Sequence, residues 1–110
     1  EYRFKNSIWR MKFQGFIEYD ENFNHFLLAL TNLARACTEA GLYSEAEQTF
    51  LLAFHYGSQK MTDYTSLADI YLHLEEPEKI SALIRNVEDG SLPHKEALIQ
   101  ALEQKLMAYR

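Results

Sequence analysis

The feature that most constrains the fold is the repetition of one residue pattern at a fixed distance along the chain. Apolar and small residues of a first stretch meet residues of the same kind 34 positions later, in the pairs Leu33 and Leu67, Ala34 and Ala68, Cys37 and Tyr71, Ala46 and Ile80, Phe50 and Ile84, and Ala53 and Val87. A fixed period of this size indicates stacked copies of one supersecondary unit. Such arrays present extended surfaces to partners, so the spacing favours a binding module over an enzyme.

Composition narrows the class of protein further. The chain of 110 residues is 47% apolar and 14% aromatic, which indicates one folded domain and argues against disorder. Only 4 Gly and 2 Pro leave few loops, which favours an all-helical chain. No apolar run reaches the roughly 18 residues that span a bilayer. The single Cys37 cannot form an internal disulfide, so we expect an intracellular, cytoplasmic protein.

The formal net charge of −5 bears on the partner. An acidic excess disfavours docking on phosphate backbones, because that affinity comes from Lys and Arg. The same charge suits basic partners or simply solubility. The chain does not begin with Met, so we expect it to be a segment of a longer protein.

Apolar residues at helical spacing predict six helices, at roughly 3–19, 25–40, 45–56, 63–74, 77–89 and 93–109. Short loops between them are typical of antiparallel neighbours. In domain terms, we expect a preceding or capping helix and loop (1–24), a repeat unit (25–58), a degenerate repeat unit (59–92) and a closing helix (93–110).

Helix ends follow from the cap residues. Gly41, Gly57 and Gly90 are predicted to stop helices, with a left-handed cap at Gly41. Pro77 suits a first helical position. Three further residues are predicted as N-caps, namely Asn24, Thr62, and Ser44 in a capping box with Glu47.

The helical spacing also predicts which residues are buried. The expected core consists of Phe26, Leu27, Leu30, Leu33, Ala34, Cys37, Ala46, Phe50, Ala53, Phe54, Tyr64, Leu67, Ala68, Tyr71, Ile80, Leu83, Ile84, Val87, Leu98, Leu102, Leu106 and Met107.

One stretch carries a family signature, which reads Leu33-Ala34-x-x-Cys37-x-x-x-Gly41-x-Tyr43-x-x-Ala46-x-x-x-Phe50-x-x-Ala53. This pattern resembles the tetratricopeptide repeat. Residues 61–94 look like a degenerate copy, which has Glu75 in place of the turn Gly and Ile80 in place of an Ala. The resemblance covers about residues 27–94 and implies a right-handed stack of antiparallel helical hairpins, an α-solenoid.

The resemblance also implies a concave groove lined by the first helix of each hairpin. Carried over by register, its candidate binding residues are Thr31, Arg35, Thr38, Thr65, Asp69, Leu72 and His73. We therefore expect a protein–protein or protein–peptide interaction module. Chaperone-binding members of the family use an Asn where Arg35 and Asp69 stand, so that activity is not expected. These two residues of opposite charge would bind an extended peptide or pair with each other.

Two other functions remain open. The chain could be a regulatory or dimerisation segment of a larger protein, such as a peptide-responsive transcription regulator. An RNA-binding pentatricopeptide-like module is suggested by Tyr64-Thr65-Ser66-Leu67, but that family's period is one residue longer and the charge is unfavourable. The aromatic residues Trp9, Phe13 and Phe16 are an interface candidate and predict weak self-association, unless they pack within the domain or its parent.

Catalytic chemistry is not indicated. His25, His55, His73 and His94 lie at no recognised metal-ligand spacing, and Cys37 occupies a core position of the repeat. There is no glycine-rich phosphate loop and no nucleophile elbow. We therefore expect no enzyme, no metal, no cofactor and no membrane insertion.

Overall fold

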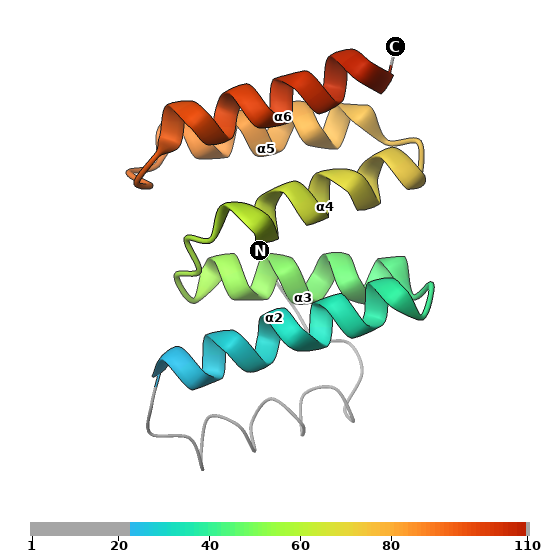
Figure 1. Cartoon of the computed structure of the whole chain (residues 1–110), viewed down its shortest axis with the longest axis vertical. Helices are drawn as coiled ribbons and strands as arrows, with labels where there is room; N and C mark the ends of the chain where they lie inside the picture. The colour runs from blue at the N-terminus through green and yellow to red at the C-terminus, as the bar shows by residue number, and fades with distance from the viewer. Residues whose placement is uncertain (1–22, 110) are drawn as a thin grey trace. The chain divides into compact units, whose positions relative to one another are not determined.

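The computed structural model of the chain describes residues 23–109, which form five α-helices and no strand. The helices are α2 (Phe23–Glu39), α3 (Tyr43–His55), α4 (Met61–His73), α5 (Pro77–Asp89) and α6 (Lys95–Tyr109) (Figure 1). The all-α prediction is confirmed for this part of the chain. The helix expected at 3–19 lies outside the described residues, as do Trp9, Phe13 and Phe16.

The chain divides into two compact units between Ser58 and Gln59. In the first unit, α2 packs along α3. In the second unit, α4, α5 and α6 contact one another, so that α6 closes a bundle with the helix pair before it (Figure 1).

The period of the sequence pattern governs the helix ends themselves. Helix α3 spans 43–55 and α5 spans 77–89, so both ends are offset by 34 positions. Helices α2 and α4 end at residues 39 and 73, and α4 and α6 begin at residues 61 and 95. Because α6 begins where a third copy would begin, it corresponds by register to the first helix of another unit.

The turn between α2 and α3 is a Schellman motif. Gly41 has φ of 78°, the Leu42 N–H donates to the Cys37 carbonyl at 2.8 Å, and the Gly41 N–H donates to the Thr38 carbonyl at 3.1 Å. This pair of bonds satisfies carbonyls that the helix end leaves without partners. The left-handed cap predicted at Gly41 is confirmed.

The turn between α4 and α5 repeats this motif without a glycine. Glu75 has φ of 59°, the Glu76 N–H donates to the Tyr71 carbonyl at 2.8 Å, and the Glu75 N–H donates to the Leu72 carbonyl at 3.1 Å. Every donor and acceptor lies one full period beyond its counterpart in the first turn. The backbone therefore keeps the turn even where the side chain disfavours it.

The helix stops predicted at Gly57 and Gly90 are also confirmed. Gly57 has φ of 101°, and the Ser58 N–H donates to the Ala53 carbonyl at 2.9 Å, so α3 ends in the same kind of motif. Gly90 caps α5 with extended backbone instead.

Two predicted N-caps are wrong, because their helices begin earlier. The cap position of α3 is Leu42, which makes no side-chain cap bond, and its carbonyl already accepts the Ala46 N–H at 2.9 Å. The Schellman turn thus leads directly into α3, and Ser44 lies inside the helix. Thr62 likewise lies inside α4, whose cap position is Lys60.

Asn24 lies inside α2, so its prediction as N-cap is wrong as well, because α2 already begins at Phe23. Pro77 occupies the start of α5 as predicted. Helix α6 begins at Lys95 rather than Pro93, because His94 has φ of 56° and a left-handed residue cannot continue a right-handed helix.

Most of the predicted core is buried. In the first unit, Phe26, Leu30, Leu52 and Ala53 form one cluster, and the partly buried Leu33 packs against it. Predicted core residues that are only half-buried are Leu27, Leu33, Phe54 and Leu106. Met107 is 72% exposed, so its prediction as core is wrong, because it lies on the solvent side of α6.

Several buried residues were not predicted, among them Leu52, Thr49 and Ile70. Thr49 is tolerated inside because its hydroxyl donates to the Glu45 carbonyl one turn earlier, at 2.8 Å. Across residues 23–109, no helix combines the length and apolar character needed to span a membrane.

Candidate functional site

The predicted groove residues of the second unit form a stripe along α4. Thr65, Asp69, Leu72 and His73 recur at helical spacing on the face that the core residues Leu67 and Tyr71 do not use. Asp69 and His73 are exposed, whereas Thr65 and Leu72 are half-buried. The stripe therefore has a solvent-facing edge and a sheltered edge.

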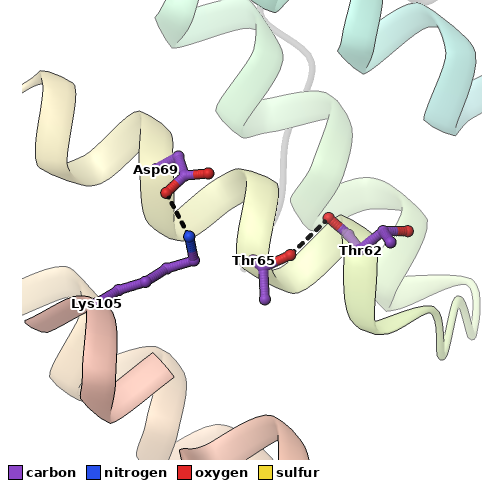
Figure 2. Close-up of polar contacts among 4 residues, drawn as sticks. All are labelled: Thr62, Thr65, Asp69 and Lys105. Carbon is purple, nitrogen blue, oxygen red and sulfur yellow. Dashed lines mark hydrogen bonds and ion pairs between the residues drawn. The ribbon is translucent and has the colours of Figure 1, made fainter. Parts of the chain in front are cut away.

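Asp69 joins this stripe to α6. The Lys105 ammonium donates to the Asp69 carboxylate at 2.8 Å (Figure 2). The Asp69 side chain keeps 62% of its surface exposed and that of Lys105 31%. Within the first unit, the Arg35 guanidinium donates to Asn32 Oδ1 at 3.4 Å. The pairing of Arg35 with Asp69 stays a prediction.

Two of the predicted groove threonines, one on α4 and one on α2, direct their hydroxyls to the backbone of their own helix. The Thr65 hydroxyl donates to the Thr62 carbonyl at 3.2 Å (Figure 2). The Thr38 hydroxyl donates to the Ala34 carbonyl at 2.8 Å. Both hydroxyl oxygens still have acceptor capacity for a ligand donor.

The first unit offers a smaller surface at the matching positions of α2. Arg35 is exposed and Thr38 is half-buried, but Thr31 is only 2% exposed. Contact of a ligand with Thr31 would therefore be slight. Leu28 and Glu39, at the two ends of the same face, are exposed.

A third stripe, on α6, was missed by sequence reasoning. Its residues are Glu96, Ile99, Glu103, Leu106 and Met107, each 34 positions beyond a residue of α4. The available signal was Leu98 and Leu102, which lie one period after the core positions Tyr64 and Ala68 and are themselves buried. One period after the core residue Tyr71, the chain has the charged Lys105, and this difference hides the third copy in the sequence.

Exposure repeats along these stripes as closely as the helix ends do. On α4 and on α6 the five positions alternate in the same order: exposed, half-buried, exposed, half-buried, exposed. On α2 the order is the same except that Thr31 is fully buried. Helices α4 and α6 thus turn equivalent five-residue faces toward solvent, and α2 turns the matching face with Thr31 buried. We call these faces stripes. The α2 stripe consists of residues 28, 31, 35, 38 and 39. The α4 stripe consists of residues 62, 65, 69, 72 and 73, and the α6 stripe of residues 96, 99, 103, 106 and 107.

Within residues 23–109, no group of three or more His, Cys, Asp or Glu side chains is arranged to hold a metal ion. Cys37 is buried and forms no disulfide. No protein-family model, no curated protein and no solved structure matches this chain.

Proposed function

We propose that this chain is a protein–peptide interaction module of the tetratricopeptide type, which binds its partner through the stripes on the first helix of each unit. In this proposal the helix pairs stack as a right-handed solenoid, and the stripes line its concave surface. The family itself is part of the proposal and is supported by the residue pattern of 33–53.

The observation that carries this proposal is the repeated exposure pattern of the α2, α4 and α6 stripes. A face that only had to be soluble could hold any polar residues at any exposure. Equivalent faces at a fixed period are suited to contacting successive residues of one elongated ligand. The half-buried positions give each face a sheltered edge where part of a ligand can be removed from water.

The chemistry of the stripes suits a peptide better than a small molecule. They hold hydroxyls, a carboxylate and a guanidinium (Thr65, Asp69 and Arg35) beside aliphatic side chains such as Leu72. Peptide main chains offer alternating donors and acceptors, and these mixed polar groups can serve both.

The test is selection of a random peptide library on the purified chain, followed by affinity measurements on the selected peptides. Arg35→Ala and Asp69→Ala should each weaken binding about fivefold or more, with little change in melting temperature. Arg85→Ala and Asp89→Ala are matched controls, because they remove the same charges from exposed positions of α5. Helix α5 is the second helix of its hairpin and carries no stripe.

Equal losses in the controls and in the stripe variants would place binding outside the stripes. A library that yields no binder under any condition would refute the peptide-binding function itself.

A further inference from the structure

The α6 stripe differs from the other two in its chemistry. The α4 stripe carries two threonines and the paired Asp69, whereas the α6 stripe consists of two glutamates and three aliphatic residues. Met107 is 72% exposed at the solvent edge of this stripe. The flexible, polarisable side chain of methionine can adapt to the surface of a partner.

The α6 residues fall into two parallel rows. Glu96 and Glu103 are exposed, and Ile99 and Leu106 are half-buried beside them. Each row pairs residues seven positions apart, which corresponds to about 10 Å along a helix. An acidic row therefore runs alongside a sheltered apolar row with the same spacing.

The negative charge of the acidic row is not neutralised by neighbouring lysines. The Lys105 ammonium is held by Asp69, and the Lys95 ammonium donates to the Gly90 carbonyl at 3.1 Å. Among residues 23–109, neither Glu96 nor Glu103 has an ion-pair partner. Glu96 also suits the N-terminal turn of α6, but Glu103 lies in the middle of the helix and has no such role.

We propose that the α6 stripe binds an extended peptide in which every three consecutive residues include one basic and one apolar residue. This inference rests on the proposed function and names the chemistry of its ligand. In a polyproline II chain, residues three apart lie on the same side and about 9 Å from each other. The peptide therefore presents one row of basic and one row of apolar side chains. These rows match the acidic and apolar rows of α6 in spacing, and they are complementary to them in charge and polarity.

The chain's charge favours the same ligand. A net charge of −5 attracts a basic segment from a distance, and contact with Glu96 and Glu103 then fixes its register. The apolar row removes the aliphatic side chains of the ligand from water, which an acidic patch alone would not do.

The test uses three synthetic peptides labelled with fluorescein, and fluorescence anisotropy on the full chain. The first peptide repeats the triplet Lys-Pro-Leu, in which proline favours the polyproline II conformation. The second replaces Lys with Glu, and the third replaces Leu with Ser. The first peptide should bind, the second should not, and the third should bind about tenfold more weakly.

The protein variants assign this binding to α6. The double variant Glu96→Gln, Glu103→Gln should bind the Lys-Pro-Leu peptide about fivefold or more weakly than wild type at low salt, and this difference should be smaller at high salt. Glu78→Gln with Glu88→Gln removes the same charge from exposed positions of α5 and should leave the affinity within about twofold of wild type. Met107→Ser should lower the affinity for the leucine-containing peptide and leave the affinity for the serine-containing peptide unchanged.

Equal affinity for the lysine and glutamate peptides, or equal losses in the α6 and α5 variants, would overturn the inference. If library selection yields peptides that depend on Arg35 and Asp69 but not on Glu96 and Glu103, the proposed function stands and this inference fails. If the library and the Lys-Pro-Leu peptide both fail to bind, both proposals fail together.

Discussion

Glu75 holds a backbone conformation that its side chain disfavours. Its φ of 59° is in the left-handed region, where a non-glycine residue costs roughly 1–2 kcal/mol. The equivalent residue of the preceding turn is Gly41, which has no Cβ to clash. The second turn is therefore held by the helices on either side of it rather than by its own residue.

We expect Glu75→Gly to stabilise the chain by about 0.5–1 kcal/mol, because relief of the backbone strain exceeds the added flexibility of glycine in the unfolded chain. Gly41→Ala should destabilise by about 1 kcal/mol through backbone strain alone, since a Cβ at Gly41 would meet no atom within 4 Å. Urea unfolding measures both. Gln100→Gly, at an exposed position inside α6, is the control and should cost about 1 kcal/mol.

Tyr64 makes the free energy of unfolding depend on pH in the alkaline range. Burial raises the pKa of Tyr64 above its usual value of 10.0, and the neighbouring Asp63 raises this pKa further. The folded state therefore holds the phenol proton more tightly than the unfolded chain does. The free energy of unfolding is unaffected below pH 10.0 and should fall as pH rises from there through the folded pKa.

Tyr64→Phe should remove this part of the alkaline loss, so the variant's stability should fall less than that of wild type above pH about 10. Urea unfolding at neutral pH and above pH about 10 measures the difference. Tyr109→Phe, at a position that is 41% exposed, is the control. Parallel losses in wild type and Tyr64→Phe would contradict the prediction.

Small residues determine how closely the helices of a hairpin approach each other. Ala34, Ala46 and Ala53 have no exposed surface, and Phe50, one helical turn from Ala46 and Ala53, is 2% exposed. Phe50→Ala should cost about 3–5 kcal/mol through lost burial and the cavity left behind. Ala46→Leu should cost about 1–3 kcal/mol through overpacking.

Ser44→Ala is the control for these core variants. Ser44 is exposed and lies inside α3, whose N-cap position is Leu42, so its removal should change stability by no more than about 0.5 kcal/mol. Urea midpoints that are unchanged for Phe50→Ala and Ala46→Leu would contradict the burial described for α3.

The Asp69–Lys105 pair is a polar connection between α4 and α6 that could not be predicted from the sequence. A double-mutant cycle with Asp69→Ala and Lys105→Ala should give a coupling of about 0.2–1 kcal/mol, typical of partly exposed ion pairs. The coupling should shrink at high salt. No coupling at low salt would show that the pair does not connect the two helices in solution.

Features of the fold that depend on a few adjacent residues follow from the sequence, whereas features that depend on distant residues do not. The stops at Gly41, Gly57 and Gly90 were predictable because a cap is a property of a few adjacent residues. The helix starts were less so: Ser44 has the right chemistry for a cap, but the preceding turn determines where α3 begins. The α6 stripe was missed because only its register with α4 reveals it.

Oligomeric state is predicted from the aromatic residues of the first segment. Trp9→Ser with Phe13→Ser should give a smaller species at high concentration in sedimentation experiments, because these side chains are expected to drive weak self-association. Met107→Ser, which removes an exposed apolar side chain elsewhere, should leave the size unchanged. A wild-type chain that is already monomeric at millimolar concentration would contradict this prediction.

The shared offset of helix ends has a consequence for engineering. Residues 61–94 run from the start of α4 to the residue before α6, and α6 begins where the next copy would begin. A duplicate of this block spliced in after His94 would present Tyr64 and Ala68 where Leu98 and Leu102 now stand. We therefore expect the chain to tolerate lengthening in whole blocks, each of which adds one helical hairpin and one more solvent-facing stripe, whereas a block of another length would place the copied core residues out of register with Leu98 and Leu102.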